Sequence, residues 1–471
     1  MSQSVEERDV ATALDAFAEL PEWLAAVMAP ERVAGALRGA VPELSGLTAA
    51  DVDRLRAKGA EWVVHCRVVL LDDGRPADLV LVGRLIPPGS PAPEGSSAVP
   101  FAEPGWSCWL PDLRLRLEVE TADAALPALP SLVDADEAST VLQRTLRDAG
   151  HAVDVAGCVP DVVRYKPGSR CTIVYRMRYR GAPGPDPLVV KTHQGDKGAT
   201  AWEAMRALWA VRAGLDDLVT LAEPLAYLPE QRVLVQGPVP EDRTLKDLAR
   251  EALTEAASGD PSPGVLDELR TGLRRTAVAL AALHRSGARY GRTATWGEEL
   301  AEVREVVDRL AATVPHIATA ADPLLTRLSA LDAAVPADGP VSAHHDFRPA
   351  QVLLHGGRIG FIDFDGACRA EPALDLGRFR AKLRDIGISA LCASGPASGA
   401  ELDRHLRLLD ELCDGFLDEY RRHAPVSPGR VVLWETTDLL TALLHAWTKV
   451  RTARVIPRLT VLRHATTALA G

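Results

Sequence analysis

Hydrophobic residues recur at helical spacing near the start of the chain and again throughout its second half. Residues 9–20 and 22–41 carry apolar side chains three and four positions apart, as amphipathic helices do. Residues 48–59, "TAADVDRLRAKG", keep this spacing and open on a threonine suited to cap a helix. From about residue 262 the pattern is helical except around residues 340–366. We therefore expect helices in both regions.

Alternating apolar and polar residues between these regions predict strands. We expect strands over residues 61–71, 77–85, 107–119, 164–179 and 187–193. A helical pattern at about residues 134–149 precedes the last two. Residues 86–105 are rich in Pro, Gly and Ser, which is typical of a loop or linker.

Two of these strand pairs resemble each other. The stretch from Arg56 and the stretch from Arg164 both run through Arg, Lys and Gly, an apolar strand, a polar turn and a second apolar strand. Chance similarity between two hairpins and internal duplication both explain the pattern. If the duplication is real, the first copy lacks the lysine that the second copy carries at position 191.

Length and composition limit the classes of protein to consider. With 471 residues, 47% of them hydrophobic, the chain suggests two or three domains with ample cores. The net charge of -11 and only seven lysines argue against nucleic acid or an anionic membrane as partner. An acidic surface suits solubility or, alternatively, a cationic substrate. Seven scattered cysteines without a CxxC pair, and an acidic start, favour reduced thiols in the cytoplasm.

Lys191 ends an apolar strand in a chain with few lysines. Burying its stem needs an anionic partner, and two are conceivable, namely nucleotide phosphates or Glu203 in the following helix. A lysine that reaches solvent from the strand edge is the alternative. Upstream, Gly168 and Ser169 allow a turn whose backbone N–H groups could cover phosphates, although a plain turn explains them equally.

Two carboxylates are brought together by the segment 342–366. Asp346 precedes a short strand, and a Gly-Gly turn leads to a second strand that ends at Asp363. Phosphoryl transfer needs this layout, because one carboxylate orients the attacking hydroxyl and accepts its proton while another holds magnesium. Gln351 can present its amide oxygen to the same cation.

These residues resemble the aminoglycoside phosphotransferase and choline kinase family, relatives of the protein kinases. The segments that carry the resemblance are "HHDFRPAQVLL", "FIDFDGA" and "EPALDLG". The resemblance implies an α+β, bilobal protein-kinase-like fold with a small β-rich N-lobe and a mostly helical C-lobe. It also implies ATP and Mg²⁺ as cofactors. We expect a cap-like α/β domain over residues 1–125 that extends the N-lobe, the N-lobe over 126–240 and the C-lobe over 241–471.

The resemblance also implies residue roles. Asp346 is the expected catalytic base, Asp363 and Gln351 the metal ligands, and Asp375 a structural acid that braces the catalytic loop. Gln351 replaces the usual Asn, as in the maltokinase-type branch, and Glu371 replaces the usual Asp before Pro. The strand and hinge over 232–248 are expected to cradle the adenine. The expected nucleotide contacts are Lys191, Glu203, Gly168, Ser169, Gln236 and Val239.

Several other residues keep two interpretations. His344 is better explained as a structural loop histidine than as a base. His345 and Arg348 either reach substrate or phosphate or belong to a solvated loop, and Asp365 either assists a second metal ion or is an exposed carboxylate. Acidic helices late in the chain either line an acceptor pocket or are solvated faces. The candidate acceptor contacts are Trp434, Glu435, Asp438 and His445.

The sequence thus predicts an ATP- and Mg²⁺-dependent phosphotransferase. Its expected partner is a small-molecule acceptor carrying a hydroxyl, such as a sugar, an aminoglycoside or another natural product, with no nucleic acid and no membrane. A Ser/Thr kinase acting on a peptide and a nucleotide-binding pseudokinase or scaffold are the alternatives. The presence of Lys191, Asp346 and Asp363 together favours an active enzyme.

Overall fold

The structure is a computed structural model that forms two compact units. It describes residues 5–58, 61–72, 75–93, 95–101, 103, 105–119, 125–166, 168–258 and 263–467. One unit contains residues 1–122, 297–331 and 439–471, and the other contains residues 123–296 and 332–438. The division into domains 1–125, 126–240 and 241–471 stays a prediction.

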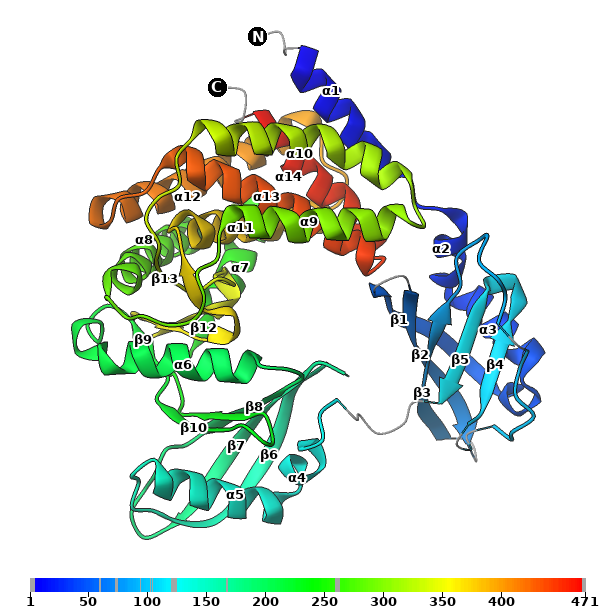
Figure 1. Ribbon diagram of the computed structural model, residues 1–471, viewed down its shortest axis with the longest axis horizontal. Helices are drawn as coiled ribbons and strands as arrows, with labels where there is room; N and C mark the ends of the chain where they lie inside the picture. Colours follow the sequence, from blue (N-terminus) through cyan, green and yellow to red (C-terminus); the bar gives the residue numbers. More distant parts are fainter. Residues whose placement is uncertain are drawn as a thin grey trace. The chain divides into compact units, whose positions relative to one another are not determined.

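The first unit begins with helices and a five-stranded antiparallel sheet of order β1-β2-β3-β5-β4. Helix α3 packs against β1 and β4 (Figure 1). Buried side chains of the sheet such as Val64, Leu81 and Leu117 provide the apolar surface that needs this cover. The elements are α1 (Val5–Leu14), α2 (Glu22–Val27), α3 (Pro30–Ala40), β1 (Leu47–Lys58), β2 (Glu61–Asp72), β3 (Arg75–Leu85), β4 (Ser107–Leu110) and β5 (Leu115–Val119).

The predicted helix over residues 48–59 is wrong, because this segment forms strand β1. Buried side chains alternate along it, at Ala50 and Val52 and again at Leu55 and Ala57, with a β-bulge between the two pairs. Pairing with β2 and cover by α3 outweigh the local helical spacing. The single strand expected over 107–119 is divided into β4 and β5 by a short turn at Pro111, where proline cannot continue the ladder.

Segments from the second half of the sequence complete the first unit. They include α9 (Trp296–Ala311), α14 (Val455–Thr467) and parts of α10 (His316–Ala334) and α13 (Pro428–Thr448). Trp62 Nε1 donates to Thr313 Oγ1 at 3.3 Å, and Trp447 Nε1 donates to the Phe17 carbonyl at 3.1 Å. The N-terminal sheet therefore belongs to the same unit as C-terminal helices. In the described residues it shares no strand with the sheet of the second unit. The sequence had suggested that this domain extends the N-lobe.

The second unit opens with the β-rich lobe, another five-stranded antiparallel sheet. Leu142 and Leu146 of helix α5 join Ile173, Tyr175 and Val190 of the sheet in one buried core. The helix predicted at 134–149 is confirmed, with Asp134 as its N-cap. The elements are α4 (Leu129–Val133), α5 (Ala135–Asp148), β6 (Asp154–Lys166), β7 (Arg170–Arg180), β8 (Leu188–His193), α6 (Lys197–Ala210), β9 (Thr220–Leu221), β10 (Pro224–Leu228) and β11 (Val233–Gln236).

The two sheets share one topology. Their orders are β1-β2-β3-β5-β4 and β6-β7-β8-β11-β10, so that each places its strands as first, second, third, fifth and fourth in chain order. A helix precedes each first strand, α3 in one case and α5 in the other. This match supports the internal duplication suggested by the two similar stretches of sequence.

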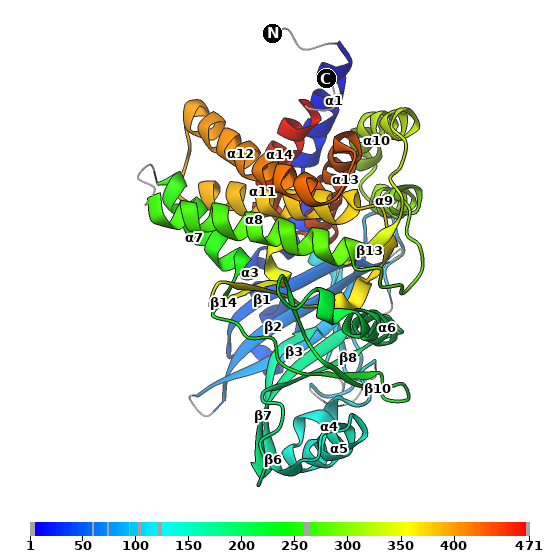
Figure 2. The same cartoon turned by 90° about the vertical axis from the view of Figure 1, so that its left-hand side faces the viewer.

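The rest of the second unit is mostly helical, as predicted. Helices α7, α8, α11 and α12 pack on one another (Figure 2). Strands β12, β14, β15 and β9 form a small mixed sheet, and β13 pairs with β16. The elements are α7 (Leu245–Ala257), α8 (Pro263–Arg285), β12 (Arg243–Thr244), β13 (Val341–Ala343), β14 (Val352–His355), β15 (Arg358–Phe361), β16 (Cys368–Ala370), α11 (Ala373–Ala393) and α12 (Gly399–His423).

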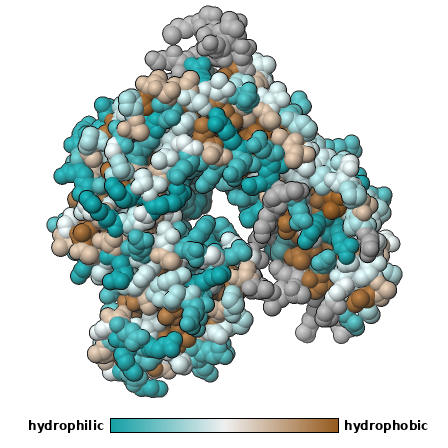
Figure 3. All heavy atoms as spheres, viewed as in Figure 1, coloured by the Kyte–Doolittle hydropathy of each residue, from teal (hydrophilic) through white to brown (hydrophobic). Residues whose placement is uncertain are grey.

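The predicted fold class is confirmed as an α+β, kinase-like arrangement of a β-rich lobe and a helical lobe, with an additional N-terminal α/β domain. Hydrophobic residues on the visible face are scattered among hydrophilic ones (Figure 3). Among the described residues, no helix combines the length and the apolar character needed to cross a membrane.

Candidate active site

The hairpin of β14 and β15 brings Asp346 and Asp363 to the same place. The loop that carries Asp346 leads into β14, and Asp363 follows β15 at once. The backbone N–H of Ile362 donates to the carbonyl of Gln351 at 3.1 Å, which holds the two ends of the hairpin together. Asp363 itself has a left-handed backbone with φ of 73°. Tight antiparallel pairing therefore creates the juxtaposition that the sequence pattern predicted.

A buried carboxylate braces the loop before Asp346. Asp375 accepts hydrogen bonds from the backbone N–H groups of His344 and His345, at 2.7 Å and 2.8 Å, and contacts His284 Nε2 at 3.0 Å. Burial disfavours its charged form, but the hydrogen bonds and charges of His284 and His344 together outweigh this and lower the pKa of Asp375. His344 Nε2 contacts the carbonyl of Ile362 at 2.9 Å, which agrees with a structural histidine.

Lys191 lies on two carboxylates that follow β15. Its Nζ is 2.6 Å from Asp363 Oδ1 and 3.1 Å from Asp365 Oδ1. Burial disfavours the ammonium, but Asp365 and Asp363 outweigh this and raise the pKa of Lys191. Burial also opposes ionisation of both aspartates, yet Lys191 holds the pKa of each below its usual value. All three groups are therefore charged at neutral pH.

Asp365 is buried, whereas the sequence allowed an exposed carboxylate. Its side chain is 10% exposed and accepts from Arg170 Nη1 at 2.9 Å. His193 Nε2 lies 2.9 Å from the same carboxylate. No role for Arg170 or His193 follows from the sequence alone. His193 lies two positions after Lys191 in β8, and side chains two positions apart share one face of a strand. This alternation could have predicted from the sequence that His193 lies beside Lys191.

Glu203 does not pair with Lys191 in this structure. Its Oε1 accepts from the backbone N–H of Gly291 at 3.1 Å, and no ion pair links it to Lys191 within the described part of the chain. The ammonium instead lies on Asp363 and Asp365. The expected pairing of Lys191 with Glu203 therefore requires Lys191 to leave these two aspartates.

Gln351 connects the two carboxylates expected to act in phosphoryl transfer. Its Nε2 lies 3.4 Å from Asp346 Oδ2 and 3.5 Å from Asp363 Oδ2. Its Oε1 accepts from Arg348 Nε at 2.8 Å, and Arg348 Nη2 lies 3.0 Å from Asp346 Oδ2. Arg348 thus orients both Gln351 and Asp346, which the sequence analysis left undecided.

The turn between β6 and β7 adds further positive charge. Gly168 has φ of 65°, a conformation that favours glycine. The N–H of Ser169 donates to the Lys166 carbonyl at 3.0 Å and closes the turn. The charges of Arg170, Asp363 and Asp346 act on Arg164, and burial together with Arg170 lowers the pKa of Arg164. The guanidinium groups of Arg164 and Arg170 therefore flank the aspartates from the β6–β7 side.

The expected hinge follows β11. Gln236 ends this strand, buried and opposite Val189 of β8. Val239 packs directly on the backbone of β15, because a Cβ added at Gly360 would lie 2.5 Å from Val239 Cγ1. Hence Gln236 and Val239 border the segment between the β-rich lobe and the helical lobe.

A family profile described as "Phosphotransferase enzyme family" matches residues 176–425, more than half of the chain, and includes Lys191, Asp346 and Asp363. The chain belongs to this phosphotransferase family. The protein is therefore an enzyme that acts as a kinase. A sequence search of curated proteins gives no match.

Solved structures similar to this phosphotransferase include a glucosamine kinase and a choline kinase. Crystal form A of the glucosamine kinase shows a TM-score of 0.49 and 17% identity, covering 96% of this chain and 99% of that chain. Crystal form B gives 0.47 and 16%, with 90% and 94% coverage. A choline kinase from Streptococcus pneumoniae gives 0.43 and 14%, with 70% and 99% coverage.

The chemistry of the donor set in this phosphotransferase fits a magnesium ion on one condition. Asp363 and Asp365 supply ionised carboxylate oxygens, which are the ligands that Mg²⁺ prefers. Both carboxylates already bind a cation, the Lys191 ammonium. Gln351 turns its amide nitrogen to Asp363 and its oxygen to Arg348. Turning the amide over exchanges N and O and supplies the missing oxygen. In the described residues, no three His, Cys, Asp or Glu side chains form a metal cluster by themselves.

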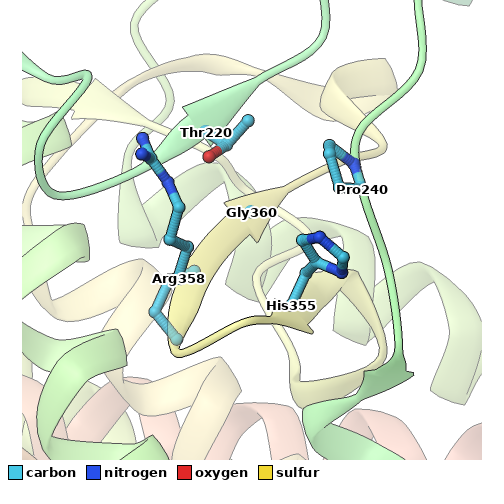
Figure 4. A pocket seen from close by; sticks show the side chains of 6 residues that line it. Thr220, Pro240, His355, Arg358 and Gly360 are labelled. Atoms are coloured by element: carbon cyan, nitrogen blue, oxygen red, sulfur yellow. The ribbon is translucent and has the colours of Figure 1, made fainter.

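A groove of about 260 Å³ lies on the β14–β15 hairpin (Figure 4). His355 contacts Asp242 at 2.8 Å, and Arg358 donates to the carbonyl of Asp216 at 2.5 Å, so both basic side chains already have partners. None of the predicted catalytic, nucleotide or metal residues lines this groove. Its lining consists of Thr220, Pro240, His355, Arg358, Ile359 and Gly360.

The candidate acceptor contacts on α13 have structural partners instead. Trp434 Nε1 donates to Glu371 Oε1 at 2.6 Å. Glu435 is buried between Arg380 and Arg384, both at 2.5 Å. These side chains are therefore committed to helix packing and are not available to an acceptor.

Asp438 is buried as well, with Arg378 at 3.0 Å and Lys382 at 2.6 Å. Arg378 also donates to the carbonyl of His345 at 2.5 Å. Arg378 thus links Asp438 to the loop that carries Asp346. The candidate contact His445 is exposed, and its role stays a prediction.

Proposed function

We propose that this phosphotransferase uses ATP and Mg²⁺ to phosphorylate a hydroxyl group of a small molecule, such as a sugar, an aminoglycoside or another natural product. The observation that carries the proposal is the cluster in which Gln351 lies 3.4 Å from Asp346 and 3.5 Å from Asp363, with Lys191 2.6 Å from Asp363. Phosphoryl transfer needs a base, a metal-holding carboxylate and a phosphate-binding cation together.

In this proposal Asp346 orients the acceptor hydroxyl and accepts its proton. Its side chain is 42% exposed, so a hydroxyl can reach it, and Arg348 fixes the carboxylate from one side. Asp363 and Gln351 would hold magnesium, which supplies charge neutralisation for the phosphate oxygens. Positioning and electrostatic stabilisation account for most of the acceleration in this reaction class.

Lys191 serves the nucleotide in this proposal. Lys191 would bind the phosphates of ATP in place of Asp363, and its ammonium would then be available to Glu203. Gly168 and Ser169 shape the turn beside the phosphates, while Gln236 and Val239 border the base. Arg170 and Arg164 add charge that favours a polyanion.

The test is ATP consumption with Mg²⁺ against monosaccharides, disaccharides, aminoglycosides and Ser/Thr peptides, with Asp346→Asn beside the unmodified enzyme. We expect turnover with a small-molecule class and a loss of about 10²–10⁴-fold in Asp346→Asn, because the proton acceptor is gone. Asp418→Asn, at a side chain 64% exposed on α12, is the matched control and should retain full activity.

The other outcomes separate the alternatives. Turnover confined to peptides would replace the proposal with a protein kinase. ATP binding without turnover on any acceptor would favour a pseudokinase, and full activity in Asp346→Asn would remove Asp346 from the catalytic role. A cytoplasmic location is part of the proposal, because all seven cysteines are free thiols, which suits a reducing compartment.

A further inference from the structure

A buried glutamine amide in the β-rich lobe has no partner. Gln236 is only 5% exposed, and within the described residues its side chain makes no hydrogen bond. The amide atoms have no partner, yet they are not fully enclosed by protein. The amide therefore faces a space that a ligand can enter. A buried amide without a partner costs stability unless a ligand completes it. Gln236 therefore needs an explanation beyond packing.

Strand register places this amide on the Lys191 face of the sheet. Gln236 lies opposite Val189, and Lys191 is two positions after Val189, so the three side chains share one face. The other face carries Val190 and Val235, which belong to the core under α5. Gln236 is thus directed to the face on which Lys191 meets the catalytic carboxylates.

Residues 237–240, which follow Gln236 directly, offer a single backbone donor. Pro238 and Pro240 have no N–H group. The N–H of Gly237 donates to the carbonyl of Glu223 at 2.9 Å. The N–H of Val239 has no partner in the described part of the chain. A single backbone N–H can serve only one ring nitrogen of a base, so a second ring acceptor needs a donor from a side chain.

We propose that Gln236 makes this enzyme selective for adenine by accepting from the N6 amino group and donating to N7. A glutamine amide matches this donor and acceptor pair of adenine, whereas guanine presents two acceptors, O6 and N7, at the same edge. The amide of Gln236 would then place its oxygen against guanine O6. This inference rests on the proposed use of ATP and adds a side chain that specifies the base.

The test measures binding of Mg²⁺-ATP, Mg²⁺-GTP and Mg²⁺-7-deaza-ATP by calorimetry, which requires no acceptor. The unmodified enzyme should bind ATP at least about tenfold more tightly than GTP, the discrimination expected of one bidentate pair. It should also bind 7-deaza-ATP several-fold more weakly than ATP, because this analogue lacks the N7 acceptor. Gln236→Met, similar in length and apolar, should remove both differences.

The controls distinguish a local effect from unfolding. Gln231→Met changes an exposed glutamine before β11 and should leave all three affinities unchanged. If Gln236→Met fails to fold, Gln236→Glu replaces it. This variant keeps an acceptor and loses the donor, so it should weaken the binding of ATP more than the binding of 7-deaza-ATP. Equal affinities of the unmodified enzyme for ATP and GTP would overturn this inference but not the proposed function. The same holds if folded Gln236→Met keeps the unmodified enzyme's ratio of ATP affinity to 7-deaza-ATP affinity. No binding of any nucleotide overturns the proposed function as well.

Discussion

Arg170 balances the charge of the two aspartates that follow β15. Its Nη1 lies 2.9 Å from Asp365 and 3.6 Å from Asp363, and its buried Nε has no partner among the described residues. A guanidinium with a spare donor can serve a carboxylate and a phosphate at once. We therefore interpret Arg170 as a ligand for the nucleotide phosphates, held by Asp365 until they arrive.

Arg170→Met should raise the KM for ATP about 10- to 100-fold, the value of one hydrogen bond between charged groups, with a smaller effect on kcat. Steady-state kinetics at saturating acceptor measures this. Arg180→Met is the matched control, since Arg180 ends the same strand with a side chain 68% exposed. A lower KM in Arg170→Met would mean that Arg170 only competes with magnesium for the carboxylates.

At the residue scale the sequence was informative where chemistry is local. Asp346, Gln351 and Asp363 lie within 18 positions of one another and one hairpin unites them, so the motif was sufficient to predict their proximity. Arg170 and Asp365 are 195 positions apart, and only the lobes' arrangement makes them partners.

At the scale of elements, α11 and α13 are joined by charges buried between them. Glu435 lies between Arg380 and Arg384, each at 2.5 Å. Burial opposes the charge of Glu435, but Arg380 and Arg384 outweigh this and lower its pKa. A side chain added at Gly377 would come 2.6 Å from the Glu435 backbone N, so the helices approach closely here. This pair of helices presents Asp375 to the catalytic loop.

Glu435→Gln should reduce the free energy of unfolding by about 3–5 kcal/mol, because two buried guanidinium groups lose their counter-charge. Glu411→Gln, whose side chain is 61% exposed and pairs with Arg270, should cost about 0–1 kcal/mol. Urea denaturation compares the two variants. Similar small losses in both would show that the network of Glu435 contributes no more than a surface pair.

A capped, periodic segment was predicted correctly as a helix at α5 but wrongly at residues 48–59. The helix at α5 has its Asp134 cap and an amphipathic pattern of 14 residues. Strand β1 was predicted as a helix because its β-bulge shifts the buried positions and imitates helical spacing. Strand β6 was missed because it is an edge strand with Gly157 and Pro160 and many exposed side chains.

At the scale of the whole molecule, the buried His405 and the largely buried His345 couple stability to pH. Burial and the Arg378 guanidinium lower the pKa of His345 from 6.5 to about 4. Burial also lowers the pKa of His405, although its contact with the Gly387 carbonyl opposes the shift. Between these values the unfolded chain binds more protons than the folded one. Stability is therefore fully present above about pH 6.5 and falls as the pH drops toward 4.

The urea midpoint should decrease from about pH 7 to about pH 5, before most carboxylates titrate. His345→Asn and His405→Asn should each flatten this dependence. Equal midpoints at both pH values would contradict the neutral, buried state of the two histidines.

The sequence by itself determined the kinase-like fold class and the local motif of the catalytic loop. Both depend on short-range order, because hydrophobic periodicity, turns and a hairpin are set by neighbouring residues. The sequence also showed two similar hairpins, which either chance or duplication could explain, and only the shared strand order of the two sheets favours duplication.

Only the tertiary structure decided which charges meet. It placed Lys191 on Asp363 and Asp365 instead of Glu203, buried Asp365, and sealed Glu435 inside the helix packing. It also grouped the N-terminal sheet with residues 297–331 and 439–471. Such partners are far apart in the chain, and their choice depends on the sum of burial and Coulomb energies in the folded state, which no local pattern encodes.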